Sequence, residues 1–221
     1  PSWVLPGATL DYDFANNRYW QSSAPGRDPS SLLTVSRASR GYVDDLAGNW
    51  VSVPANQLRV SNKGTLIEEA RTNSITNNSM QGAVVGSPGT LPTNWGFVAA
   101  GGLASNVVGL GTVKGIDYVD IRFFGTTSGT FMVFGFSPGA GYAASPGDNW
   151  SESIFAAIVG GSLTNITSVN TQIRFTGALS PNLTFSLTET LTRTMQANIA
   201  GAGTTAVVPA IGFSYSSGVA V

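Results

Sequence analysis

Residues 183–199, LTFSLTETLTRTMQANI, alternate between apolar and polar side chains. Apolar residues hold most of the odd positions, and Thr, Ser, Gln or Asn fills every even position. A period of two indicates β-structure, because successive side chains of a strand point to opposite faces of a sheet. The stretch is too long for one ordinary strand, so it predicts two strands that turn near residues 189–193. We expect the odd positions to face the core and the even positions to face solvent.

The rest of the chain supports the same fold class. Further strands are expected at short apolar or alternating runs bounded by Gly, Pro and Asn: residues 10–14, 32–36, 50–53, 118–124, 131–136, 153–159, 172–175 and 207–213. Many short strands separated by turns are typical of β-sandwiches and jelly rolls. The sequence therefore predicts an all-β fold, a jelly-roll or β-sandwich preceded by an N-terminal strand-and-turn region.

The charges divide the chain into two parts. Residues 1–72 hold seven of the eleven basic and seven of the twelve acidic residues. The polar stretch TNSITNNS, residues 72–79, follows this charge-rich part and marks a domain boundary. Aromatic residues and arginine, which are enriched at protein interfaces, are frequent before the boundary. We therefore predict an attachment or assembly region at residues 1–72 and a β-sandwich at residues 73–221.

The composition limits the chemistry of the chain. Its net charge is −1, so nothing in the total favours nucleic acid or an anionic membrane. No apolar run approaches the roughly 20 residues of a membrane-spanning helix. Histidine and cysteine are both absent, which excludes thiolate metal sites and catalytic triads built on either residue. We expect no cofactor, no metal site and no catalytic residue.

Paired carboxylates are the remaining catalytic possibility, because two of them suffice for glycoside hydrolysis. The candidates are two neighbouring pairs and one set spread along the sequence: Asp44 with Asp45, Glu68 with Glu69, and Asp117, Asp120, Asp148 and Glu152. Neighbouring carboxylates in a strand point to opposite faces, so neither pair flanks one bond. The spread set would have to converge in one groove. A surface-polysaccharide hydrolase or lyase therefore stays open as the alternative, against acids that are solvated or ion-paired.

Sugar binding without catalysis needs only flat aromatic faces beside hydrogen-bonding groups. The segments PTNW, residues 92–95, and GDNW, residues 147–150, combine both in connecting regions rich in Gly, Pro and Asn. The candidate carbohydrate-binding residues are Trp95, Asn94, Trp150, Asn149, Asp148 and Tyr142. The competing interpretation is that each tryptophan fills one end of the sandwich, since large aromatic side chains are usually mostly buried.

Residues 64–73, GTLIEEARTN, resemble the signature GLLIEEARTN that recurs in phage tail-fibre, head-spike and related virion proteins. Upstream, LDYDF (10–14), RYW (18–20) and LTVSRAS (33–39) are similar to the run found before that signature. Downstream, NNSMQG (77–82) and LPTNW (91–95) resemble the opening of carbohydrate-binding jelly rolls, with Met80 in place of the usual aromatic residue. The stretch from Trp150 to Ile166 also matches these phage modules.

The resemblance implies a structural protein of a phage or phage-like particle, a head or tail spike or fibre. It implies an attachment or decoration role, contact with other virion proteins, and a homo-oligomer, most often a trimer. From the aromatic and amide groups in the segments of Trp95 and Trp150 we expect weak multivalent binding to a host-surface glycan. We expect no nucleic acid partner and no membrane insertion, because of the net charge of −1 and the lack of a long apolar run. Family members usually continue past the region that matches residues 214–221 into one more strand, so we expect a C-terminal truncation. A capsid or tail module that binds no sugar is the third possibility.

Overall fold

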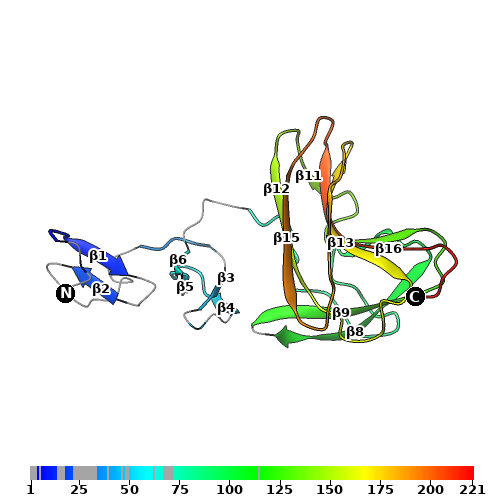
Figure 1. The fold of residues 1–221 in the computed structure, drawn as a ribbon, viewed down its shortest axis with the longest axis horizontal. Coiled ribbons are helices and arrows are strands. Elements are labelled where there is room, and N and C mark those ends of the chain that lie inside the picture. The colour runs from blue at the N-terminus through cyan, green and yellow to red at the C-terminus, as the bar shows by residue number, and fades with distance from the viewer. Residues whose placement is uncertain are drawn as a thin grey trace. The chain divides into compact units, whose positions relative to one another are not determined.

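The computed structural model of the 221-residue chain describes residues 4, 6–13, 18–21, 34–38, 40–45, 47, 50–61, 63–66, 72–113 and 115–221. Every regular element among them is a β-strand, which confirms the predicted all-β fold class (Figure 1). In this part of the chain no helix is long and apolar enough to cross a membrane. Contacts divide the chain into two compact units, Pro1–Thr72 with Thr112–Asp117, and Asn73–Gly111 with Tyr118–Val221.

Strands of the first unit pair with their neighbours in sequence. The antiparallel pairs are β1 (Leu10–Asp13) with β2 (Arg18–Gln21), β3 (Gly41–Asp44) with β4 (Trp50–Val53), and β5 (Val60–Ser61) with β6 (Gly64–Thr65). In the first pair Tyr12 lies opposite Tyr19, with ring centroids 5.8 Å apart, and Asp13 forms an ion pair with Arg18. The strand expected at residues 32–36 lies partly outside the described residues, and residues 34–36 form no strand.

The second unit is a two-layer arrangement of antiparallel pairs. Its larger layer is a six-stranded sheet in the order β14–β13–β16–β10–β7, with β11 paired to β16. The strands of this sheet are β7 (Gly96–Ala99), β10 (Phe131–Gly135), β11 (Tyr142–Ala143), β13 (Ile166–Thr176), β14 (Asn182–Phe185) and β16 (Ala206–Tyr215). Most neighbours in this sheet are far apart in sequence, as in sandwich folds.

The smaller layer consists of two separate ribbons. They pair β8 (Leu103–Val113) with β9 (Ile116–Gly125), and β12 (Asn149–Ala156) with β15 (Thr192–Ile199). Figure 1 shows β12 and β15 alongside β13, and β8 and β9 running crosswise to them. The chain therefore crosses between layers each time it leaves β7, β9, β11, β12, β14 and β15.

An aromatic cluster joins the β8–β9 ribbon to the sheet. Its centre is Phe134, which is 1% exposed. The rings of Trp95, Phe97, Phe123 and Phe136 lie with their centroids 5.4–6.5 Å from that of Phe134, all in edge-to-face arrangements. Such pairs contribute about 0.5–1.5 kcal/mol beyond the burial of their surface. A second buried cluster lies under the β12–β15 ribbon and contains Ala144, Ile173, Phe175, Ala200 and Val207.

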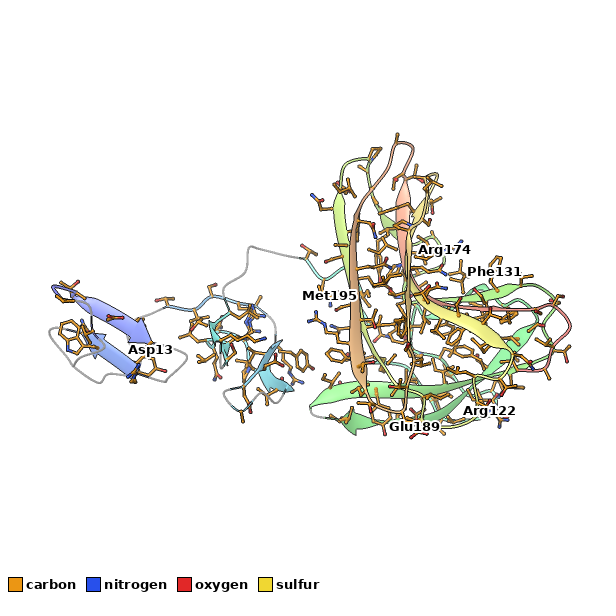
Figure 2. The ribbon with its side chains drawn as sticks, in the orientation of Figure 1. Asp13, Arg122, Phe131, Arg174, Glu189 and Met195 are labelled. Atoms are coloured by element: carbon orange, nitrogen blue, oxygen red, sulfur yellow. The ribbon has the colours of Figure 1, made fainter. Side chains whose placement is uncertain are left out.

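Residues 183–199 form two strands, β14 and β15, as predicted, but the predicted facing of β15 is wrong. Met195 and Ile199 are 60% and 66% exposed, whereas Gln196 and Asn198 are partly buried (Figure 2). The physical reason is a polar contact between the layers, because Gln196 Nε2 donates to Glu152 Oε2, its cross-strand neighbour on β12, at 3.2 Å and to Thr171 Oγ1 of the opposing strand β13 at 3.3 Å. A period of two identifies the two faces of a strand, but the partner surface decides which face is buried.

Replacing Phe134 by Ala should lower the free energy of unfolding of the second unit by about 3–5 kcal/mol, because it opens a cavity in the aromatic cluster. Phe131→Ala is the matched control, since Phe131 begins the same strand and is 49% exposed. Its cost should be about 1 kcal/mol or less. Urea unfolding followed by tryptophan fluorescence measures both. Equal losses in the two variants would contradict the placement of the core.

Candidate functional site

Trp95 lies immediately before β7, in a turn that is held by side-chain hydrogen bonds. The side chain of Asn77 holds this turn, since its Nδ2 donates to the carbonyls of Gln81 and Thr93 at 2.9 and 2.8 Å. The Trp95 ring packs edge-on against Phe136 with centroids 4.7 Å apart, and its indole N–H is buried with no hydrogen-bond partner among the described residues. Asn94 is exposed and has a φ of 71°, in the left-handed region. The ring therefore belongs partly to the core.

Trp150 and Tyr142 lie in strands, which corrects their predicted place in connecting segments. Trp150 is the second residue of β12 and packs against the cluster around Ile173. Tyr142 begins β11, packs against the same cluster, and donates from its hydroxyl to the Phe136 carbonyl at 3.4 Å. Both rings are thus used largely to fill the space between the layers.

Asp148 and Asn149 are exposed beside Trp150. The carboxylate of Asp148 accepts a hydrogen bond from the Ser145 amide at 2.8 Å, which closes a short turn. Asn149 is the first residue of β12 and pairs with Ile199. The six residues predicted from the sequence therefore form two groups, Asn94 with Trp95 and the other four around the start of β12.

Two half-open hollows adjoin on the second unit. The first, of about 440 Å³, is lined by Asn94, Trp95, Gly96, Phe97, Val98, Ser137, Pro138 and Gly139. The second, of about 430 Å³, is lined by Val98, Gly139, Ala140, Arg174, Phe175, Thr176, Ser180 and Val208. Val98 and Gly139 line both hollows, so we treat them as one groove and call it the Val98 groove. Each volume is within the range of small-molecule sites, about 300–1,000 Å³.

A row of polar side chains on β13 leads into this groove. Gln172 Nε2 donates to Asn170 Oδ1 at 2.5 Å, and Arg174 Nη1 donates to Gln172 Oε1 at 3.0 Å. We call these three residues the β13 ladder. On the neighbouring strand Gly212 lies opposite Asn170, and a Cβ there would lie 2.2 Å from Gln172 Nε2. Glycine at this position therefore lets the ladder lie close to the sheet.

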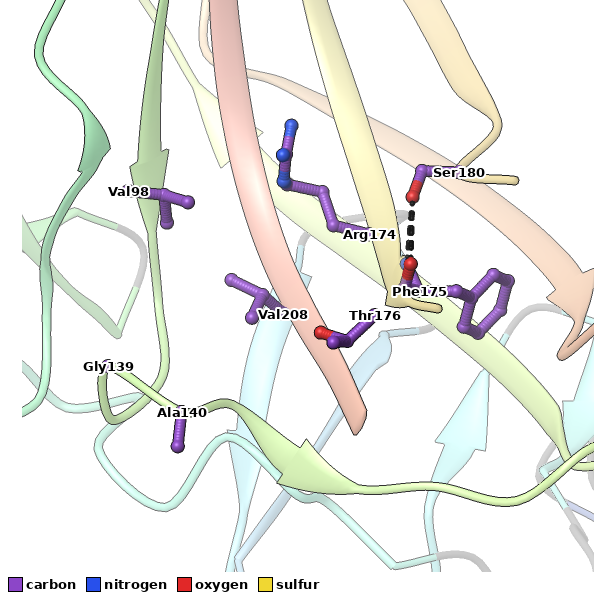
Figure 3. A pocket seen from close by; sticks show the side chains of 8 residues that line it. All are labelled: Val98, Gly139, Ala140, Arg174, Phe175, Thr176, Ser180 and Val208. Carbon is purple, nitrogen blue, oxygen red and sulfur yellow. Dashed lines mark hydrogen bonds between the residues drawn. The ribbon is translucent and has the colours of Figure 1, made fainter. Parts of the chain in front are cut away.

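The ladder ends at Arg174, which lines the second hollow (Figure 3). Figure 3 also shows Val98 and Val208 at this hollow, with Gly139 and Ala140 on the adjoining loop. The ladder residues are absent from the set predicted from the sequence. A signal for them exists, since residues 168–175, SVNTQIRF, place Ser, Asn, Gln and Arg on every second position. Such alternation is typical of a strand with one polar face.

Glu152 is buried on the opposite side of β13, between the two layers. It is 4% exposed, and its Oε2 accepts hydrogen bonds from Thr171 Oγ1 and from Gln196 Nε2. Its Oε1 is buried without a hydrogen-bond partner in the described part of the chain. Burial raises the pKa of Glu152 to about 7, although the hydrogen bonds from Thr171 and Gln196 act to lower it. A carboxyl group in this setting favours its neutral form.

The spread set of carboxylates does not line the groove. Asp148 is engaged with the Ser145 amide, Glu152 is buried between the layers, and Asp117 accepts a hydrogen bond from Thr112 Oγ1 at 3.2 Å. Among the residues that the structure describes, no group of three or more His, Cys, Asp or Glu side chains could hold a metal ion. The groove thus combines aromatic, amide, hydroxyl and guanidinium groups.

Comparison of the chain with protein-family models, curated proteins and solved structures gives no match. The class of this protein is therefore described from its fold and its site alone. The second unit is a two-layer β-sandwich whose larger sheet carries a half-open groove lined by both apolar and polar residues.

Changing Glu152 to Gln should make the stability of the second unit less dependent on pH. The folded pKa of about 7 lies above the ordinary value of 4.5. The protonated group therefore stabilises the fold fully below about pH 4.5, and this contribution is lost as the pH rises through about 7. The shift corresponds to about 3 kcal/mol. Glu152→Gln should recover up to that amount at pH 8 and almost nothing at pH 4.

Urea unfolding at several pH values measures this difference. Glu189→Gln is the control, because Glu189 is an exposed acid of the same unit. The assignment fails if Glu152→Gln and the unchanged chain lose stability in parallel between pH 4.5 and pH 7.

Proposed function

We propose that this chain is a structural protein of a phage or phage-like particle, a spike or fibre component that contributes to host attachment by weak multivalent glycan binding. The observation that carries the proposal is the stretch GTLIEEARTN, residues 64–73, with its resemblance to the signature of virion proteins. The Val98 groove supports the binding part, because it places the Trp95 ring and the Asn94 amide beside one hollow.

A single groove of this kind gives low affinity. The exposed part of one aromatic ring contributes on the order of 1–2 kcal/mol on contact with an apolar sugar face. A dissociation constant of 1 mM already requires about 4 kcal/mol. Several copies that bind one repetitive polymer together raise the effective affinity by orders of magnitude. Attachment through this groove therefore fits a homo-oligomer, for which a trimer is the favoured arrangement in proteins of this kind.

The first unit serves assembly in this proposal. It holds most of the charged residues of the chain and several aromatic residues, including Tyr12 and Tyr19 on paired strands. These residue types are enriched at interfaces between subunits. Docking to other virion proteins or to neighbouring copies would leave the groove of the second unit for the glycan.

A surface-polysaccharide hydrolase or lyase is the second candidate. Glu152 favours it, because a pKa near 7 is suited to a general acid at neutral pH. Against it, the side chain of Glu152 meets Thr171 on the face of β13 opposite the ladder, so it points away from the Val98 groove. Glycoside hydrolysis also uses a pair of carboxyl groups around the bond. A module that contacts other virion proteins and binds no sugar is the third candidate.

The virion assignment predicts that the chain copurifies with particles. Antibodies raised against it should decorate particles from the source culture in electron micrographs, and they should slow adsorption of the particles to host cells. A particle map should place the chain in several symmetry-related copies. Detection of the chain only in the cell fraction, with none in purified particles, would remove the virion role.

The groove predicts different results for the two groups of candidate residues. Asn94→Gly removes an amide from the groove and keeps a residue that tolerates the φ of 71°. It should weaken binding to host-surface polysaccharide about fivefold with an unchanged melting temperature. Asn149→Ala, at an exposed position outside the groove, is the matched control and should bind normally. Trp150→Ala should melt several degrees lower and, where folded, bind as before.

Affinity electrophoresis and thermal melts give both readouts on the same samples. Loss of binding in Asn149→Ala together with normal binding in Asn94→Gly would move the glycan site to the start of β12. Normal binding in all three variants would leave the groove without a role in attachment.

A further inference from the structure

Arg174 is the one cationic side chain that lines the Val98 groove among the described residues. No carboxylate of the described chain lies within ion-pair distance of its guanidinium. Among the described residues, its hydrogen-bond partner is an uncharged amide, Gln172 Oε1, at 3.0 Å. The neighbouring Gln172 amide orients the guanidinium but does not neutralise its positive charge. The charge therefore remains available to a ligand in the hollow.

One hydrogen bond orients the guanidinium before a ligand arrives. Arginine has five N–H donors, and the described protein atoms accept one of them here. Gln172 is itself held by Asn170 at 2.5 Å, and both are only 6% exposed. A planar guanidinium on a rigid frame matches the two oxygens of a carboxylate, and such charge-assisted pairs are roughly twice as strong as neutral hydrogen bonds.

The rest of this hollow fits a sugar ring rather than a free small anion. Val98, Ala140 and Val208 give it an apolar side, which suits the CH groups of a pyranose. Thr176 adds an exposed hydroxyl. The Ser180 hydroxyl accepts the Phe175 amide hydrogen at 2.9 Å and fixes the rim (Figure 3). An apolar side, hydroxyls and one guanidinium together match a sugar that carries a carboxylate.

We propose that the Val98 groove binds an acidic polysaccharide, with the carboxylate of a uronic-acid unit on Arg174 and a neighbouring sugar beside Trp95. The inference rests on the proposed glycan attachment and names its ligand class. The two hollows share the lining residues Val98 and Gly139, so adjacent sugar units would occupy neighbouring hollows.

The test uses the full chain in affinity gels that contain polygalacturonate or alginate, each compared with its esterified form. Esterification keeps the sugar backbone and removes the carboxylate charge. The full chain should bind the acidic polymers about tenfold more tightly than the esters, and Arg174→Gln should remove that difference. Binding to the esters should not change in this variant.

Two further variants separate the Arg174 contact from general electrostatics. Arg122→Gln removes the same charge from an exposed position on β9, where the guanidinium lies over the Phe124 ring, and it should bind normally. Gly212→Ala keeps every charge but forces Gln172 and Asn170 to move, because its Cβ would lie 2.2 and 2.7 Å from their amide atoms. It should weaken binding to the acidic polymers and leave binding to the esters nearly unchanged.

The outcomes separate this inference from the proposed function. Equal binding to acidic and esterified polymers would overturn the acidic ligand and leave glycan attachment standing. An equal loss in Arg122→Gln and Arg174→Gln would overturn the role of the groove guanidinium. Equally strong, Arg174-dependent binding to dextran sulfate would overturn the preference for carboxylate. Failure to bind any of the polymers, acidic or esterified, would overturn both this inference and glycan attachment through the groove.

Discussion

The carboxyl group of Glu152 lies between the two layers of the second unit and accepts hydrogen bonds from Thr171 on β13 and Gln196 on β15. Burying a polar group without partners costs several kcal/mol, so these three side chains must meet once the layers close. Thr171 is thereby turned toward β12 and β15. Because side chains alternate along a strand, its neighbours Gln172 and Arg174 are turned to the opposite side of the sheet. One face of β13 thus makes the contact between the layers, and its other face contributes to the groove.

Trp95 connects the groove to the core in a second way. One part of its ring packs against Phe136 in the aromatic cluster, and the residue also lines the first hollow. The turn before it is held by Asn77, which is only 8% exposed. A binding surface built in this manner loses little conformational entropy on contact with a ligand. Rigidity of the groove follows from the packing beneath it.

The sequence predicts the strands well where the pattern is local. The apolar run at residues 131–136 became β10, and the alternation at residues 183–199 became β14 and β15. The alternation does not show which side of β15 is buried. Gln196 is turned inward and Met195 outward because Gln196 hydrogen-bonds to Glu152, and this contact between two strands has no signal in the local sequence. Trp150 was likewise predicted in a loop, although Asn149 and Trp150 already belong to β12. The groove depends on the strand order, which brings Arg174 beside Val208 and has no local signal.

Three residues with little or no side chain lie beside the ladder on the neighbouring strands. Gly135, Ala210 and Gly212 lie on the same side of the sheet as Gln172, whereas Pro209 and Ile211 project to the other side. A Cβ at Gly135 would lie 2.9 Å from a Val98 methyl. A methyl group added at Gly135 or Gly212 would therefore displace Val98, which lines the groove, or Gln172, which holds Arg174. A change of one carbon atom at these positions would alter the shape of the groove, while the strand order and the packing between the two layers stay the same.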